Sequence, residues 1–326
     1  MHLEHVYPTL PQYLAAVQER LAELSRSDLG PLTGAARQAT GGAAKRYRPA
    51  LLLLCMELGC PADRRAVEYG AVIEAVHSAS LVHDDVIDEA DRRRGEPSLR
   101  AALGSKLAVL VGDYLVARSM GVAAGQGDLE IMRVLADTAQ EMARAQVHEL
   151  LATGSLLDEP TYLRIISGKT ASLFACACQV GARLGGADEH REAGLREYGW
   201  QVGMAFQLAD DLRDLAALPQ DEGKPGNHDL ATGKVTLPLI WTLREGDGTV
   251  RRELSALLAR EGDDGRRERI RALVCGPGSD YAAAMAQGHV RSALAGLAGL
   301  PASPARAALA TMAEAVAPCR VPAHLT

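Results

Sequence analysis

Residues 71–94 read AVIEAVHSASLVHDDVIDEADRRR, and this stretch decides the fold. Apolar side chains recur in it at the spacing of a helix, at Ala71, Ile73, Ala75, Val76 and Ala79. Alternating, strand-like runs are scarce elsewhere in the 326 residues. Gly and Pro fall between the helical stretches, as expected of turns between helices rather than of one linker between domains. The sequence therefore predicts an all-α fold with a single domain over residues 1–326.

Bulk composition limits the class of protein. Hydrophobic residues make up 48% of the chain and charged residues 23%, which is a globular composition with enough apolar side chains for a large core. The net charge of −6 argues against a general nucleic-acid binder, because such a protein needs a positive field to displace counterions from phosphates. We therefore expect no nucleic-acid partner.

Cysteine spacing and the N-terminal residues indicate a compartment. The six cysteines form no Cys-x-x-Cys pair and no dense framework, so we expect reduced thiols rather than disulfides or a zinc site. The first residues, MHLEHVYPTLPQYL, lack the basic segment and apolar run of a secretory signal. The apolar stretch Ala50–Cys55 is far shorter than the roughly 20 residues that cross a bilayer. The chain is predicted to be cytoplasmic, with no transmembrane segment.

Two acidic clusters of identical spacing are the most informative feature. One lies in LVHDDVIDEADRRRG and the other in FQLADDLRD, and each places carboxylates at positions i, i+1 and i+4. Their members are Asp84, Asp85 and Asp88, and Asp210, Asp211 and Asp214. Residues four apart on a helix share a face, so the outer two carboxylates of each cluster can approach one ligand.

The charge of these clusters favours a bound metal ion. Carboxylates this close repel one another, and both clusters follow apolar segments, so a cation should offset them. Magnesium fits, because this hard ion takes oxygen ligands and commonly combines a few carboxylates with water and substrate phosphates. A solvated acidic patch is the other interpretation of either cluster alone, but two such clusters in similar apolar contexts favour magnesium sites.

Basic residues near Gly and Pro turns indicate phosphate as the shared ligand. Arg92, Arg93 and Arg94 directly follow the first cluster, where they could bind the oxyanions that metal ions bridge. Other Lys and Arg residues stand in GGAAKRYRP, SGKT, EGKPG and TGKVTLP. These positions are expected helix ends, where backbone N–H groups also favour anions. Any one of these residues alone would be interpreted as part of an ordinary surface.

With these motifs, the sequence resembles the trans-prenyl diphosphate synthase, or polyprenyl synthetase, family. The resemblance runs from about Gly41 to Pro238 and rests on HDDVIDEADRRRG, SGKT, FQLADDLRDL and GKPG…DLATGKVTLP, which occur in the family's order. It implies a homodimer in which each chain is a single large helical bundle around a deep central cavity. Residues 1–40 would be an N-terminal helical segment, where the match is weakest.

The resemblance also implies a role for each matching residue. The six aspartates would hold magnesium, with three ions when substrate is bound, and would grip the diphosphate of an allylic substrate. The residues that would also contact this diphosphate are Arg93, Lys169 and Lys224, of which Lys169 counts with the aspartates as catalytic. The residues that match the isopentenyl diphosphate site are Lys45, Arg48, His77 and Arg94. The residues that would line the reacting region are Thr170, Gln207 and Lys234.

The reaction that the resemblance implies is a prenyl transfer. The allylic carbon–oxygen bond ionises, the double bond of isopentenyl diphosphate attacks the allyl cation, and a proton passes to the released diphosphate. The product is an all-trans prenyl diphosphate. Metal ions and cationic side chains would stabilise the charge that grows on the leaving group, so no side-chain nucleophile is needed.

Product length should depend on side chains beside the growing hydrocarbon tail. Ala79 and Ser80 lie five and four residues before Asp84, about one helical turn away, and both are small. Family members that stop at short products often carry aromatic residues here. The chain therefore resembles enzymes that make products of C20 or longer.

Some residues depart from the family's pattern. Ala43 and Ala44 separate the glycines from the Lys-Arg-x-Arg-Pro that usually follows them, and Arg100 stands where a histidine or other polar residue is usual. In ARAQVHEL, Gln146 stands where many longer-chain members carry Glu, and Glu149 where they carry Gln. These departures bear on product length and substrate preference rather than on the class of reaction.

Two other functions remain open. A class I terpene cyclase would share the fold and the metal, but cyclisation benefits from aromatic faces, and the chain has only two Phe, two Trp and eight Tyr. A non-catalytic regulatory subunit of a heterodimeric synthase is the second alternative. Such a subunit need not retain all six aspartates together with three matching lysines, so a catalytic chain is favoured.

Overall fold

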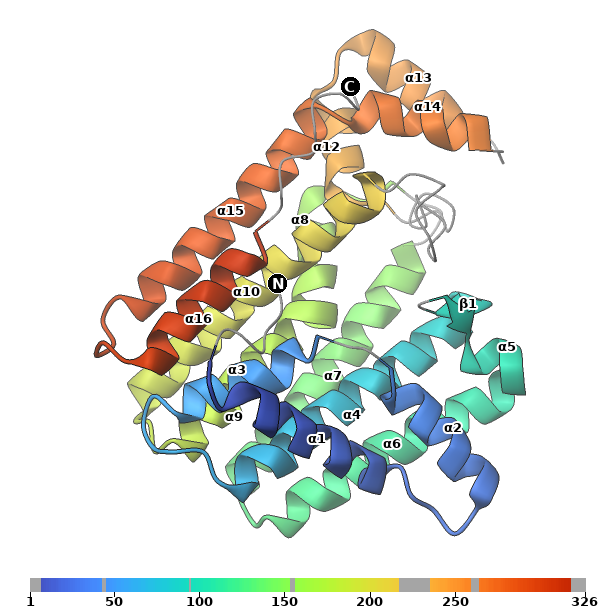
Figure 1. Ribbon diagram of the computed structural model, residues 1–326. Coiled ribbons are helices and arrows are strands. Elements are labelled where there is room, and N and C mark those ends of the chain that lie inside the picture. The colour runs from blue at the N-terminus through green and yellow to red at the C-terminus, as the bar shows by residue number, and fades with distance from the viewer. Residues whose placement is uncertain are drawn as a thin grey trace. The chain divides into compact units, whose positions relative to one another are not determined.

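The structure is a computed structural model that describes residues 7–42, 45–93, 95–152, 156–216, 235–258 and 264–317. These ranges are almost entirely helical, which confirms the predicted all-α fold (Figure 1). The chain divides into two compact units. The first unit comprises Met1–Glu141, Ser172–Trp200 and Ala293–Ala315, and the second comprises Met142–Ala171, Gln201–Ser292 and Val316–Thr326. The single domain over residues 1–326 stays a prediction.

The first unit contains most of the helices before residue 142. They are α1 (Leu10–Leu24), α2 (Gly30–Thr40), α3 (Tyr47–Met56), α4 (Arg64–Ile87), α5 (Leu99–Leu103) and α6 (Ser105–Gly125). Two later helices, α9 (Ser172–Leu184) and α16 (Pro304–Ala315), also belong to this unit. Three long helices contribute residues to both units, namely α7 (Leu129–Ala152), α10 (Glu189–Ala216) and α15 (Pro277–Leu297).

Helix α3 forms the centre of the first unit's core. All 10 of its residues are buried, because its sequence continues PALLLLCM with no polar face. It packs against α1, α4, α9 and α16. The approach of α9 is close, since a Cβ atom added at Gly181 would lie 2.2 Å from the carbonyl oxygen of Leu52. The apolar stretch Ala50–Cys55 is therefore part of an interior helix.

Helix α4 carries the first acidic cluster and packs against α1, α3, α6 and α9. Its N-terminus is capped by Asp63, whose carboxylate accepts a hydrogen bond from the N–H of Arg65 at 2.8 Å. Helix α6 approaches so closely that a Cβ atom at Gly112 would lie 2.1 Å from Nε2 of His83. That nitrogen is 3.2 Å from the carbonyl oxygen of Val109. These contacts hold the end of α4 at which the cluster lies.

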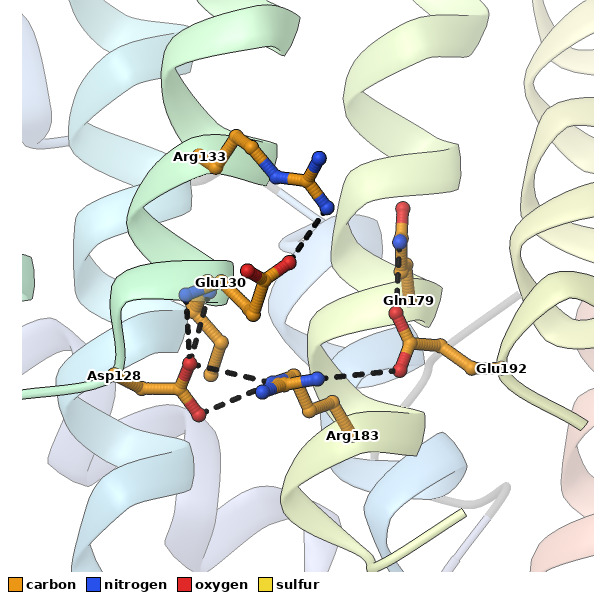
Figure 2. Close-up of polar contacts among 7 residues, drawn as sticks. Asp128, Glu130, Arg133, Gln179, Arg183 and Glu192 are labelled. Carbon is orange, nitrogen blue, oxygen red and sulfur yellow. Dashed lines mark hydrogen bonds and ion pairs between the residues drawn. The ribbon is translucent and has the colours of Figure 1, made fainter. Parts of the chain in front are cut away.

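A polar cluster links α7, α9 and α10 within the first unit (Figure 2). The carboxylate of Asp128 caps α7 by accepting hydrogen bonds from the N–H groups of Glu130 and Ile131 at 3.0 and 3.1 Å. On α9, Nε of Arg183 lies 3.1 Å from Oδ2 of Asp128, and Nη1 lies 3.8 Å from a carboxylate oxygen of Glu192 on α10. These contacts join the ends of three helices, so the cluster stabilises the fold.

A short hairpin follows the first acidic cluster. Strands β1 (Arg92–Arg93) and β2 (Glu96–Pro97) pair antiparallel, with Arg92 opposite Pro97 and Arg93 opposite Glu96. With two residues in each strand, the hairpin is too short for an alternating pattern to predict it. The hairpin places Arg93 beside the end of α4, where its guanidinium group pairs with the carboxylate of Asp85.

The second unit contains α8 (Glu159–Ile166), α12 (Leu237–Glu245), α13 (Gly248–Leu258) and α14 (Asp264–Val274). Between α8 and α9 lies η2 (Ser167–Ala171), a single π-helical turn formed by SGKT and the following alanine. Such turns are rare and occur often at functional sites. One apolar core of this unit joins α12, α13 and α14 to the end of α10, and it consists of Leu215, Leu239, Leu254, Ile270, Val274 and Cys275.

Helix α6 is apolar along most of its length. An 18-residue window has a mean hydropathy of 1.5, and 33% of that window is buried. By length and composition alone this helix could cross a membrane, but the core helix of a soluble protein passes the same test, so one such helix is weak evidence. The predicted absence of a transmembrane segment and the predicted cytoplasmic location both stay predictions.

Candidate functional site

The first acidic cluster lies at the C-terminal end of α4. Asp84 and Asp85 occupy its last turn, and the N–H of Asp88 bonds to the carbonyl oxygen of Asp84 at 2.8 Å. This end of a helix carries partial negative charge, so three carboxylates here need a cation to offset them. Asp84 and Asp88 are partly exposed, whereas Asp85 is only 4% exposed. The accessible carboxylates are therefore the two at positions i and i+4.

The buried carboxylate of the first cluster is held by Arg93. Nε of Arg93 lies 2.8 Å from both carboxylate oxygens of Asp85, and Nη2 lies 2.6 Å from Oδ1. The side chain of Arg93 remains 38% exposed. A guanidinium group has five N–H donors, so this pair leaves donors for an anion. The predicted contact of Arg93 with diphosphate stays a prediction, and the structure adds the partner that orients the arginine.

Part of the predicted isopentenyl diphosphate site lies near the start of α3. Lys45 is exposed, His77 on α4 is partly exposed, and Arg48 is 9% exposed. The guanidinium carbon of Arg48 lies 4.5 Å from the ring centroid of Phe174. Burial lowers the pKa of Arg48 to about 10, against the opposing charge of Glu74. Nε of Arg48 is buried without a hydrogen-bond partner, and such a cation favours an anionic ligand.

Arg46, a potential phosphate donor by sequence, is instead used inside the fold. It adopts a left-handed backbone conformation with φ of 50°, and its side chain is 8% exposed. Nη1 donates to Glu74 on α4 at 2.6 Å, while Nη2 donates to Gln18 at 2.5 Å and to the carbonyl oxygen of Thr40 at 2.8 Å. These partners come from α4, α1 and α2, so Arg46 stabilises the segment that carries Lys45 and Arg48.

The second acidic cluster lies near the end of α10, in the second unit. Asp210 has a 52% exposed side chain and pairs with Arg213 at 3.0 Å, and Asp214 is partly exposed. Asp211 is only 7% exposed. Burial raises the pKa of Asp211 to about 7, reinforced by the charges of Asp210 and Asp214 and opposed by hydrogen bonds from Tyr162 and Gln207. The second cluster therefore has the same pattern of exposure as the first, with one buried carboxylate between two accessible ones.

The predicted reacting-region residues Thr170 and Gln207 are brought together. Oγ1 of Thr170, in η2, donates to Oε1 of Gln207 on α10 at 2.7 Å. The amide nitrogen of Gln207 then donates to Oδ1 of Asp211 at 2.7 Å. The π-helical turn is therefore connected by hydrogen bonds to the second acidic cluster.

Lys169, also in η2, forms an ion pair with Glu149 on α7. The two side chains are 23% and 22% exposed, so both remain reachable from solvent. Glu149 is one of the departures from the family's pattern, and the structure assigns it a physical role as a counter-ion of Lys169. The sequence indicated that this position is unusual, but 19 intervening residues hide the contact.

Some predicted residues fall outside the described part of the chain. They are Arg94, Lys224 and Lys234, and the Ala43-Ala44 departure is among them too. Their roles stay predictions.

The two predicted chain-length residues differ in their surroundings. Ala79 is 0% exposed and belongs to a buried apolar cluster that includes Ala36 on α2 and Val111 on α6. Ser80 is partly exposed, and its hydroxyl donates to the carbonyl oxygen of His77 at 2.8 Å. A larger side chain at Ala79 would therefore press on this core, whereas Ser80 is not fully enclosed.

The donor set suits a metal ion that is shared with a ligand. In the described parts of the chain, no three His, Cys, Asp or Glu side chains lie close enough to hold a metal ion by themselves. Each cluster instead presents two accessible carboxylates. They are Asp84 and Asp88 in the first cluster and Asp210 and Asp214 in the second. A hard cation that completes its coordination with water and phosphate oxygens fits such partial sites, as magnesium does.

Known proteins resemble this chain over most of its length. The sequence profile of the polyprenyl synthetase family matches residues 31–274. Heptaprenyl diphosphate synthase component 2 from Geobacillus stearothermophilus is 40% identical over 247 residues, which cover 75% of this chain and 77% of that protein. Octaprenyl diphosphate synthase from Escherichia coli is 35% identical over 247 residues, or 76% of each protein.

The fold also matches a solved structure over nearly the whole chain. A polyprenyl synthase from Caulobacter crescentus, crystallised with calcium and isoprenyl diphosphate, is similar with a TM-score of 0.91. It is 30% identical in sequence, and the match covers 98% of both chains. The likeness therefore extends beyond the residues that carry the motifs.

Proposed function

The chain belongs to the polyprenyl synthetase family and is a prenyl-transferring enzyme, and from this premise we propose that it condenses isopentenyl diphosphate with an allylic prenyl diphosphate using magnesium. The proposal rests on one observation, that each acidic cluster has two accessible carboxylates and one buried carboxylate. The accessible ones are Asp84, Asp88, Asp210 and Asp214, and behind them Asp85 and Asp211 are buried and held by protein donors.

Each part of the site has a task in this reaction. The accessible carboxylates would hold the magnesium ions, with Asp85 and Asp211 completing the clusters from behind. When bound, magnesium supplies Lewis-acid stabilisation of the negative charge on the leaving diphosphate. The chain's cations add to that stabilisation, and the residues assigned to the allylic diphosphate are Arg93, Lys169 and Lys224.

Binding of isopentenyl diphosphate is assigned to Lys45, Arg48, His77 and Arg94. The buried position of Arg48 supports this assignment, because a guanidinium group with an unpartnered Nε gains a hydrogen-bond acceptor when diphosphate binds. The allylic carbon–oxygen bond breaks with its electron pair on the diphosphate. The isopentenyl double bond then forms the new carbon–carbon bond, and the proton lost from the adjacent carbon passes to the released diphosphate.

Thr170, Gln207 and Lys234 are assigned to the reacting region. The oxygen of Thr170 and the amide of Gln207 are fixed by their hydrogen bond, so they form an ordered polar surface rather than a mobile one. Ordered dipoles stabilise developing charge better than groups that must first rotate into place.

We propose a product of C20 or longer. The small side chain of Ser80 one turn before the first cluster supports this length. Two relatives with at least 35% identity are named for heptaprenyl and octaprenyl products, which contain seven and eight isoprene units. Glu149 in the position of a family Gln leaves the upper length open.

An assay with two substrate mixtures tests the reaction against its alternatives. With magnesium and an allylic diphosphate alone, we expect no product, and with isopentenyl diphosphate added we expect longer prenyl diphosphates by mass spectrometry. Chelation of divalent ions should abolish the second result. A hydrocarbon formed from the allylic diphosphate alone would instead indicate a terpene cyclase. Inactivity of the purified chain with both substrates would support the regulatory subunit.

We also propose that the enzyme is a homodimer that buries the exposed face of α6. Leu110 and Val109 on that face are 59% and 38% exposed, although the helix is strongly apolar. Exposed apolar patches of this kind commonly mark protein interfaces. The relative named component 2 leaves a heteromer as the alternative, in which a different chain would cover the same face.

Substitution Leu110→Glu is expected to convert the homodimer to a monomer, because a carboxylate would be desolvated in the interface. Leu29→Glu is the matched control, since Leu29 is a similarly exposed leucine at 61% on the same unit, before α2. Light scattering should give the mass of a dimer for the wild type and the control. A wild-type monomer, or a Leu110→Glu dimer, would contradict the proposal.

A further inference from the structure

Tyr162 contacts the buried carboxylate of the second acidic cluster. Its hydroxyl donates to Oδ2 of Asp211 at 2.5 Å, and the two residues are 4% and 7% exposed. The other carboxylate oxygen of Asp211 accepts the amide hydrogen bond of Gln207 at 2.7 Å. Both oxygens of Asp211 are thus occupied by protein donors from two directions, and rotation of the carboxylate would break both bonds.

The contact also aligns two segments of the second unit. Tyr162 in α8 donates a hydrogen bond to Asp211, and Thr170 in η2 donates one to Gln207. The two donors are eight residues apart in sequence, and the two acceptors on α10 are four residues apart. The order is antiparallel, because the later residue of the α8–η2 segment meets the earlier residue of α10. The segment that carries Lys169 is therefore fixed to the helix that carries the second cluster at two points.

We propose that Tyr162 is a positioning residue that orients Asp211, and through it the accessible carboxylates of the second cluster, for binding of a divalent cation with a diphosphate. The inference rests on the proposed function and extends it to a residue outside the acidic and basic motifs. The geometry supports it because the hydroxyl of Tyr162 donates to Asp211, which is one residue from Asp210 and three residues from Asp214. Hydrogen bonds to charged groups are among the stronger ones in proteins.

The test compares Tyr162→Phe with Tyr281→Phe. Tyr281 is a matched control because its hydroxyl also donates to a carboxylate in the second unit, that of Glu159 on α8, at 2.8 Å. Each variant loses one hydroxyl and keeps its ring, but only the first loses a contact with the acidic cluster. The probe is magnesium titrated at a fixed concentration of inorganic diphosphate, and the readouts are calorimetry and the rise in Tm.

Tyr162→Phe should weaken magnesium binding in the presence of diphosphate by about tenfold, which is the scale of one hydrogen bond to a charged group. The magnesium affinity of Tyr281→Phe should stay within about twofold of the wild type. This should hold even if, without metal, its Tm falls as much as that of Tyr162→Phe. Equal magnesium affinities in the two variants would overturn the proposal. So would a Tyr162→Phe protein that does not fold, because the hydroxyl would then serve the fold.

A double-mutant cycle tests whether Tyr162 affects magnesium binding through Asp211. In an Asp211→Asn background, Tyr162→Phe should change magnesium affinity by less than about twofold, because the carboxylate through which it acts is gone. A full tenfold effect in that background would overturn the assignment to Asp211. Wild-type protein that binds no magnesium with diphosphate would instead reject the proposed magnesium dependence, so the two failures are distinguishable.

Discussion

Replacement of Asp210 by alanine is expected to lower kcat by about a hundredfold or more while the helical fold is retained. Asp210 is accessible, so its loss removes a proposed metal ligand without removing core volume. In the described part of the chain its side chain forms an exposed ion pair with Arg213, three residues along the helix. Such surface pairs contribute roughly 0–1 kcal/mol, so the free energy of unfolding should hardly change.

The matched control for this substitution is Asp280→Ala. Asp280 is an exposed aspartate in the first turn of α15, outside both acidic clusters. The kcat of Asp280→Ala should stay near that of the wild type. Circular dichroism should show the same helical content for Asp210→Ala and Asp280→Ala. Asp84→Ala should repeat the loss in the first cluster. Near-wild-type turnover of Asp84→Ala and Asp210→Ala at saturating magnesium would reject the role of the two clusters.

The second large effect concerns product length, and we expect Ser80→Phe to shorten the main product by at least one isoprene unit. Ser80 is partly exposed one turn before the first cluster, so we expect a phenyl ring there to block the proposed path of the hydrocarbon tail. Condensation should continue, because the acidic clusters and their cationic partners are unchanged. Mass spectrometry of the products measures the shift directly.

Ser80→Ala and Ala79→Phe are informative companions of this variant. Ser80→Ala removes the hydroxyl without adding volume and should leave product length unchanged. Ala79 is fully buried between helices, so a phenyl ring there should overpack the core and cost about 1–3 kcal/mol of stability. If Ser80→Phe gives the wild-type product distribution, the tail follows another route.

The regular features of this protein could be predicted from its sequence. Apolar periodicity predicted an all-α chain, and the repeated spacing of aspartates predicted which carboxylates share a helix face. Both are local properties, because they depend on residues within one or two turns of each other. The apolar character of α6 was harder to recognise, since Asp113 and Arg118 interrupt it and only an average over 18 residues reveals it.

The partners of the site residues could not be predicted in the same way. Tyr162 and Asp211 are separated by 49 residues, and Arg46 and Glu74 by 28, so no local pattern links them. Each contact depends on how distant helices pack against one another, and local sequence patterns do not reveal that packing. For the same reason the sequence could not separate Arg46, which is used inside the fold, from Arg48, whose Nε is left unpartnered.

The buried contacts of Arg46 have a consequence for substrate capture. Its guanidinium group bonds to residues of α1, α2 and α4, and the backbone between Lys45 and Arg48 is thereby restrained when the protein folds. A flexible segment would lose conformational entropy each time a ligand ordered it, at roughly 1–2 kcal/mol for each backbone residue. Here that entropy is lost when the protein folds. If Arg48 binds diphosphate as proposed, its backbone is therefore already restrained when the ligand arrives, and less of the binding free energy is consumed in ordering the protein.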